Sequence, residues 1–288
     1  MLSGRMDYGI LAVMKLLWKK SRRNLKGETA VATQVKGKCK YCGKEYTRSY
    51  IMRHLASCKA RKERDEGQQG RKKCGYFDLL VSGKYNRDMW LAIEVTENAP
   101  LQEVDTFLRN IWLECCGHLS AFEINGTSYE SHPDLDDFWG EPAESMNCRL
   151  KNILEKGMVF RYEYDFGSTT ELVIQVANYR KAPEKRDVLT LLSRNEAEEY
   201  ICWRCGKRPA VYVDTNEVDP WGYHGKEAFV CEKCADKYYG DDFYFLNVCN
   251  SPRMGICGYE GSRFYPDQFV PDVSVPAGDQ SKTPSGRK

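Results

Sequence analysis

Four residues between Cys39 and Cys58 have the types and spacing of a metal site. Cys39 and Cys42 are separated by two residues, so one tight turn could place both thiolates on adjacent corners of a tetrahedron. Gly43 suits that turn because glycine tolerates a positive φ. His54 and Cys58 are four residues apart and would project from one face of a helix. The pattern predicts a Zn²⁺ ion held by Cys39, Cys42, His54 and Cys58.

Two further pairs of cysteines, Cys202/Cys205 and Cys231/Cys234, form a second candidate set. Each pair has the C-x2-C spacing, and together they supply the four thiolates of a closed structural zinc site. A strand is expected after Gly206 and a short helix after the second pair, so this module resembles a zinc ribbon or treble clef. With all four positions filled by protein, the ion would stabilise rather than catalyse. A redox role for one exposed pair is the rival interpretation.

The other cysteines fit neither pattern. Since cysteine packs as a small hydrophobic residue, buried free thiols are expected for Cys74, Cys115, Cys116, Cys148, Cys249 and Cys257. His224, Cys249 and Cys257 lie near the second set in sequence, and whether one of them replaces a ligand stays open.

A core must form between the two sets in order to position them. Apolar runs predict strands at 76–83 and 89–96, and a helix starting after Pro100. Asn125-Gly126 predicts a two-residue hairpin turn. A short helix over 149–156 should end at Gly157, and residues 158–176 should form two strands around a turn near Gly167. The fold class expected is α+β, a mixed β-sheet domain with packed helices flanked by two small zinc-binding modules.

Alternating aromatic residues mark the strand that runs from Met158 to Phe166. One face carries Met158, Phe160, Tyr162, Tyr164 and Phe166, and the other is mostly charged. An aromatic face could stack on nucleic-acid bases, but a period-two apolar face more often packs into a core, which is the expectation here.

Three stretches resemble a known family. "MWLAIEVTENAPLQEVDTFLRNIW", "GHLSAFEING" and "MVFRYEYDFGS" are similar to the plasmid pRiA4b ORF-3-like domain, a family associated with plasmids and mobile elements, over roughly residues 75–185. The most specific element is "YEYDFG". Relatives often continue with an acidic residue, a tryptophan and a histidine, whereas this chain has Ser168, Thr169 and Thr170. The set Cys39, Cys42, His54 and Cys58 resembles a classical zinc finger with cysteine as the last ligand. This N-terminal finger and the tail "NSPRMGICGYEG" also resemble pieces that accompany the domain. The resemblance implies an α+β fold and no particular activity.

Charge is divided unevenly along the chain. Residues 1–73 contain 20 Lys/Arg against 6 Asp/Glu, a net charge of +14, so the remaining residues carry −12 of the total +2. A basic arm of this kind could meet a phosphate backbone or lie on the acidic body. Its candidate nucleic-acid-binding residues surround the first cysteine set: Arg48, Arg53, Lys59, Arg61, Lys62 and Arg64. A single finger carries little sequence information, so non-specific DNA or RNA contact is expected.

The expected organisation has five segments. They are a basic segment (1–34), a finger with three cysteine ligands and one histidine followed by a basic helix (35–73), the pRiA4b ORF-3-like α+β domain (74–200), a four-cysteine module (201–265) and a disordered tail (266–288). The chain lacks the long apolar run of a membrane helix and the flanks of a secretory signal, and free cysteines suit a reducing compartment, so a cytoplasmic location is expected.

No catalytic motif is recognisable in the sequence. The histidines left over from the finger fit no metalloprotease, deaminase or nucleophile-elbow pattern, and no phosphate-binding loop is present. The acidic loop 131–144 matches no calcium-binding template. The leading hypothesis is therefore a zinc-binding, non-enzymatic binding or regulatory protein that touches nucleic acid through its basic finger. The alternative is a protein–protein interaction adaptor with purely structural zinc, which would use the acidic body, and a metal-dependent enzyme is a third hypothesis.

Overall fold

The computed structural model describes residues 35–68, 70–133, 143–218, 224–239 and 244–274. The predicted basic segment 1–34, most of the acidic loop and the last part of the predicted tail lie outside these residues. None of the described helices is both long and apolar enough to cross a membrane.

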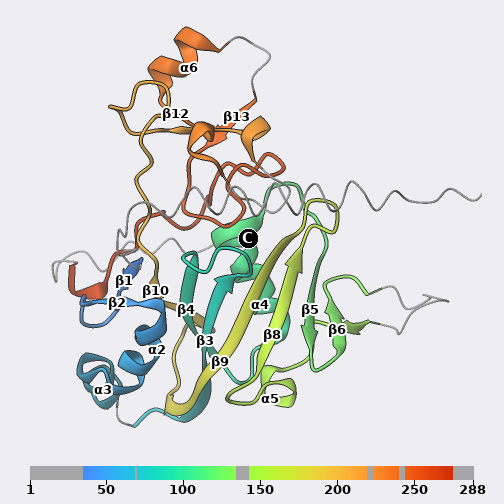
Figure 1. The fold of residues 1–288 in the computed structure, drawn as a ribbon. Coiled ribbons are helices and arrows are strands. Elements are labelled where there is room, and N and C mark those ends of the chain that lie inside the picture. Colours follow the sequence, from blue (N-terminus) through green and yellow to red (C-terminus); the bar gives the residue numbers. More distant parts are fainter. Residues whose placement is uncertain (1–34, 69, 134–142, 219–223, 240–243, 275–288) are drawn as a thin grey trace, which may run out of the picture. The chain divides into compact units, whose positions relative to one another are not determined.

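A large β-sheet forms the body (Figure 1). Its eight strands lie in the order β10-β4-β3-β9-β8-β5-β6-β7, and every pair is antiparallel except β6 with β7. The expected α+β fold with a mixed sheet and few helices is confirmed. In chain order the strands are β3 (Lys73–Gly83), β4 (Trp90–Thr96), β5 (Ser120–Ile124), β6 (Thr127–Glu130), β7 (Glu144–Ser145), β8 (Val159–Tyr164), β9 (Thr170–Pro183) and β10 (Leu189–Arg194).

Strands β3 and β4 are buried on both faces of the sheet. Successive side chains of a strand point to opposite sides of a sheet. In β3, Leu79 and Val81 therefore enter the main core while Leu80 enters a second one, and in β4 Ile93 and Ala92 divide in the same way. This explains why both strands read as apolar runs in the sequence, interrupted by Asp78 in β3 and by Glu94 in β4.

The first face is covered by the helix expected after Pro100. It comprises α4 (Leu101–Leu108) and a single π-helical turn, η1 (Arg109–Leu113). Leu101, Val104, Leu108 and Ile111 pack into the main core, as their helical spacing predicts. The helix ends at Leu113, before the cysteine pair. The short helix α5 (Leu150–Ile153) also ends earlier than predicted, since Leu154 already has an extended backbone.

The second face is covered by the finger. It contains the hairpin β1 (Lys36–Lys38) and β2 (Glu45–Thr47), followed by α2 (Arg48–Ser57) and α3 (Lys59–Glu66). Ile51 and Leu55 of α2 are buried in one cluster with Trp90 and Leu192 of the sheet. Gly37 of β1 bridges to Asn195, next to β10. The finger is therefore the second layer over β4, β3 and β10, rather than an appendage.

The predicted turns are present. Asn125 and Gly126 have φ values of 52° and 81°, as a hairpin turn with two left-handed residues requires, and they join β5 to β6. Tyr162 and Tyr164 of β8 are fully buried, so the aromatic face is core as expected, whereas Phe166 lies in the turn and is exposed.

The four-cysteine module has its own small sheet, of order β12-β11-β13. Its elements are β11 (Tyr212–Asp214), η2 (Thr215–Glu217), η3 (Lys226–Ala228), β12 (Phe229–Val230), α6 (Glu232–Tyr238) and β13 (Phe245–Asn247). The expected strand follows the first cysteine pair. The expected helix begins at Glu232 and therefore contains Cys234 rather than following it.

The chain then returns to the body. Trp112 Nε1 donates to the carbonyl of Asn250 at 3.0 Å, and Ser251 donates to the carbonyl of Trp112 at 2.6 Å.

The predicted disordered tail begins too early. Residues 266–274 make specific contacts with the rest of the chain: Phe269 is buried, and Asp272, at the start of η4 (Asp272–Ser274), pairs with Lys40 at 2.8 Å and with Arg64. The prediction of disorder was wrong for these residues because such long-range contacts leave no periodic signal in the sequence. Residues 275–288 lie outside the described part.

Candidate metal centres and the basic surface

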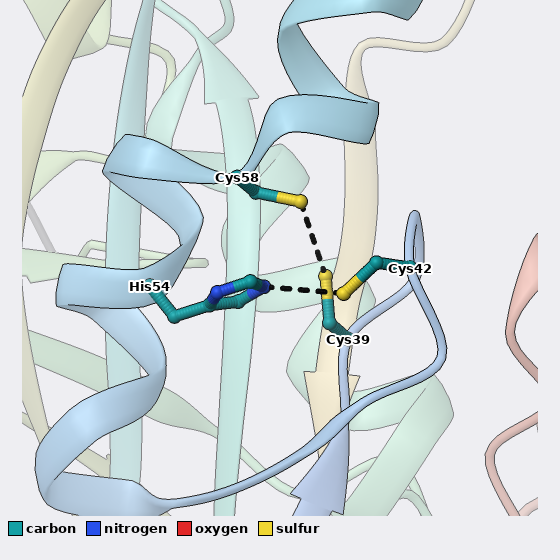
Figure 2. Close-up of side chains that lie close together, drawn as sticks. All are labelled: Cys39, Cys42, His54 and Cys58. Carbon is teal, nitrogen blue, oxygen red and sulfur yellow. Dashed lines mark hydrogen bonds between the residues drawn. The ribbon is translucent and has the colours of Figure 1, made fainter.

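The predicted ligands of the finger come together. Cys39 and Cys42 lie on the turn between β1 and β2, and His54 and Cys58 come from α2 and its C-terminal end (Figure 2). All four ligand atoms lie within 4.8 Å of one another. Cys39 Sγ is 4.0 Å from Cys58 Sγ, and Cys42 Sγ is 3.4 Å from His54 Nε2. A tetrahedral zinc ion would separate two sulfurs by about 3.8 Å and a sulfur and a nitrogen by about 3.6 Å, so the set fits.

The surroundings of these ligands favour metal binding. Burial raises the pKa of Cys39 to about 12, although hydrogen bonds from the backbone N–H groups of Cys42 and Tyr41 act to lower it. A buried Cys39 thiolate therefore needs a cation beside it. Burial lowers the pKa of His54, which favours the neutral imidazole that ligates metals. The ring of Tyr46, the aromatic residue of β2, stacks on the His54 ring with centroids 3.9 Å apart. Gly43 has a φ of 69°, the left-handed conformation that the turn requires.

The four cysteines of the second set also converge. Their sulfurs lie within 4.8 Å of one another, and Cys205 Sγ is 4.0 Å from Cys231 Sγ. The backbone N–H groups of Arg208 and Lys207 lower the pKa of Cys205 to about 6 and so favour its thiolate. Gly206 has a φ of 59°, which closes the turn after the first pair.

The residues that could have replaced a ligand lie elsewhere. Cys249 is buried in an apolar cluster with Met254 and Tyr259, and burial raises its pKa. His224 Nε2 lies 2.8 Å from the carbonyl oxygen of Met254. Neither is grouped with the four cysteines.

A third group of ligand side chains was missed by sequence reasoning. Cys115, Cys116, His118 and Cys257 have their ligand atoms within 4.8 Å of one another. The expectation of buried free thiols was wrong for Cys116 and Cys257, which are exposed. The run "CCGH" places a cysteine and a histidine at C-x2-H spacing, and this was the available signal.

Arg61 has a different role from the one predicted for it. Its side chain is buried, with the residue 2% exposed, and it donates to Asp78 at 2.5 and 3.0 Å and to Glu94 at 2.6 Å. Glu94 also accepts hydrogen bonds from Arg180 and Lys185. Arg61 therefore anchors the finger to the sheet and is not available to a phosphate. The assignment of Arg61 to a nucleic-acid surface is corrected because two strand carboxylates, each 1% exposed, require it as their counter-ion.

The other basic residues remain at the surface. Arg53, Lys59 and Lys62 are exposed, and Arg48 is half-buried. The guanidinium of Arg53 lies 4.4 Å from the centre of the Tyr50 ring, which is itself 44% exposed. Arg64 is exposed but paired with Asp272.

Comparison with known proteins supports the family resemblance. Residues 81–199 match the model of the family described as plasmid pRiA4b ORF-3-like protein, and this segment includes β4 to β10. A crystal structure of a protein of unknown function, MM3350 from Methanosarcina mazei Go1, is similar at 20% identity over 42% of this chain and 68% of that chain, with a TM-score of 0.34. No curated protein gives a significant match.

Proposed function

We propose that this chain is a zinc-stabilised, non-catalytic binding protein that contacts nucleic acid through the exposed basic side of its finger. Two Zn²⁺ ions would hold the finger and the four-cysteine module in the shapes described above. Thiolate-rich ligand sets of this kind stay reduced in the cytoplasm, where we place the protein.

Zinc is the metal that suits both ligand sets. Three thiolates with one imidazole, or four thiolates, in a tetrahedral arrangement are typical of structural zinc sites. Because protein side chains would fill all four positions, neither ion keeps a position for water or substrate. We therefore assign no catalytic step to either site.

The division of the finger into two sides carries the nucleic-acid proposal. One side, with Ile51, Leu55 and Arg61, is docked on the sheet. Arg53, Lys59 and Lys62 are left exposed, and the Arg53–Tyr50 pair adds an aromatic ring on which a base could stack. Such a surface recognises the phosphate backbone and carries little sequence information.

The test is the salt dependence of binding by the full chain. Labelled duplex DNA of arbitrary sequence is titrated, and log K is plotted against log salt concentration. On duplex DNA each phosphate contact contributes about 0.9 to the slope, so Arg53→Ala/Lys59→Ala/Lys62→Ala should flatten it by up to about 2.7. The matched control, Lys151→Ala/Lys156→Ala/Arg161→Ala, removes three exposed charges from the sheet domain and should leave the slope unchanged. Equal slopes for the wild type and the finger variant would refute the proposal that these three residues contact the phosphate backbone.

The docking of the finger favours a second candidate function, a protein-interaction adaptor. A finger held by buried ion pairs acts as scaffold, and the acidic body would then meet the partner. Deleting residues 1–73 is a poor test because it would uncover Trp90 and leave Asp78 without Arg61. Substitutions in the full chain avoid this problem. A partner protein that is kept by the finger variant and lost by Glu123→Gln/Glu155→Gln/Asp187→Asn would support the adaptor.

A further inference from the structure

The third group of ligand side chains lies where the C-terminal segment returns to the sheet domain. We propose that Cys115, Cys116, His118 and Cys257 bind a third Zn²⁺ ion, which is more accessible than the other two and fastens this segment to the domain. This site goes beyond the proposed function, which does not depend on it.

The ligands come from two distant parts of the chain. Cys115, Cys116 and His118 follow the end of η1, and Cys257 is 139 residues beyond His118. His118 Nε2 lies 3.3 Å from Cys257 Sγ, close to the separation of about 3.6 Å that a shared tetrahedral zinc ion would give.

Unusual backbone conformations bring the ligands together. Gly117, between Cys116 and His118, has a φ of 74° and turns the chain sharply. Cys257 has a φ of 49°, which is uncommon for a residue with a side chain, and it is followed by Gly258 with a φ of 70°. Strained residues of this kind cluster at ligand sites, where the surrounding contacts hold them in place.

A second observation that points to a metal is the carboxylate behind the histidine. While Nε2 of His118 faces the sulfur of Cys257, Nδ1 lies 3.5 Å from Asp165 Oδ1. Metal-binding histidines commonly donate their other ring N–H to a carboxylate, which fixes the tautomer and orients the ring. Asp165 is itself held by Arg253 at 2.6 Å and by the backbone N–H of Gly167 at 3.0 Å.

Arg253 also contacts one of the proposed ligands. Its guanidinium is fully buried and donates a hydrogen bond to Cys115 Sγ at 3.6 Å. Arg253 and Cys257 belong to the same returning segment, and Asp165 belongs to the turn after β8. One set of contacts thus ties the segment, the turn and the proposed ligands together.

The chemistry of the donors selects the metal. Three sulfurs and one imidazole nitrogen form a soft to borderline set that suits Zn²⁺ and excludes hard ions such as Mg²⁺ or Ca²⁺. Because Cys116 and Cys257 are exposed, a chelator could reach this ion directly. Cys39 and Cys58 of the finger and three of the four cysteines of the second set are buried, so those ions should exchange more slowly.

The first experiment counts zinc on the reduced full chain by native mass spectrometry. The wild type should carry three ions and Cys116→Ser/Cys257→Ser two. The matched control, Cys74→Ser/Cys148→Ser, removes two cysteines that belong to none of the three groups and should keep three. Brief exposure to a chelator should remove one ion from the wild type before the others. Two ions on the wild type, or three on the Cys116/Cys257 variant, would overturn the proposal.

The second experiment uses the wild type alone, so folding of a variant does not matter. Alkylation of Cys116 and Cys257 is followed by mass spectrometry after the briefly chelated protein is supplied with one equivalent of Zn²⁺ or left without it. At least a tenfold slower reaction with zinc is expected at these two cysteines, and an unchanged rate at Cys148. Equal rates at Cys116 and Cys257, or a disulfide joining them in protein trapped directly from lysate, would contradict a metal site.

Discussion

Replacing Arg61 with methionine tests whether the finger is held by its buried ion pairs. Arg61→Met keeps much of the side-chain volume and removes the charge. Both oxygens of Asp78 accept their hydrogen bonds from Arg61, at 2.5 and 3.0 Å. The variant therefore leaves the Asp78 carboxylate, at 1% exposure, without this counter-ion. Glu94 keeps Arg180 and Lys185, so the loss falls mainly on Asp78.

The expected loss is large for one substitution. Breaking a buried ion pair by removing one partner lowers the free energy of unfolding by about 3–5 kcal/mol. Removing the stranded charge as well should relieve most of this loss, because Asp78 lies on the face of β3 that carries Leu80 and meets the apolar finger cluster. We therefore expect Arg61→Met/Asp78→Leu to be more stable than Arg61→Met.

Urea unfolding at a fixed free zinc concentration measures these differences. Zinc binding then contributes equally to every variant, and the double-mutant cycle isolates the Arg61–Asp78 coupling. Lys62→Met is the matched control, since Lys62 is the exposed neighbour on the same helix, and it should change stability by no more than about 0.5 kcal/mol. An Arg61→Met variant as stable as Lys62→Met would refute the docking argument.

Two other predictions concern the docking of the finger on the sheet. Burial opposes ionisation of Glu94, but Arg61, Lys185 and Arg180 outweigh it and lower its pKa from 4.5 to about 2. Its charge therefore stabilises the fold above pH 4.5, by roughly 3 kcal/mol, and this contribution is lost as the pH falls towards 2. The difference in unfolding free energy between wild type and Glu94→Gln should be constant from pH 7 to 5 and shrink below 4.5; a difference that grows in acid would contradict this. Gly37→Ala should destabilise the docked hairpin by about 1–3 kcal/mol, because its Cβ would lie 2.1 Å from the backbone oxygen of Arg194. The control is Gly67→Ala, whose Cβ would make an ordinary contact at 3.5 Å. It should change the unfolding free energy by no more than about 0.5 kcal/mol in the same assay.

The sequence predicts well what local spacing determines. The C-x2-C pairs, the four-residue step from His54 to Cys58 and the Asn125-Gly126 turn each need only neighbouring residues, and the structure contains all of them. The strands and the start of the long helix follow from periodicity in the same way. The π-helical turn that ends this helix has no periodic signature.

Contacts between distant parts of the chain explain the errors. "KARKERDE" reads as a solvated basic helix, and nothing within it distinguishes Arg61 from Lys62. The signal was in the partners: Asp78 and Glu94 each interrupt an otherwise apolar strand, and a carboxylate in such a position needs a buried counter-ion.

The third ligand group was missed for the same reason. Cys257 is 139 residues from His118, and only the folded chain brings the two together.

The zinc content of the finger and of the four-cysteine module tests the central claim most directly. Zinc per chain is measured on reduced, full-length protein for the wild type, Cys39→Ser/Cys58→Ser and Cys202→Ser/Cys231→Ser. The account predicts that each double variant carries one zinc ion fewer than the wild type, while the other ions stay bound. A wild type without stoichiometric zinc, or double variants that keep the wild-type content, would contradict it.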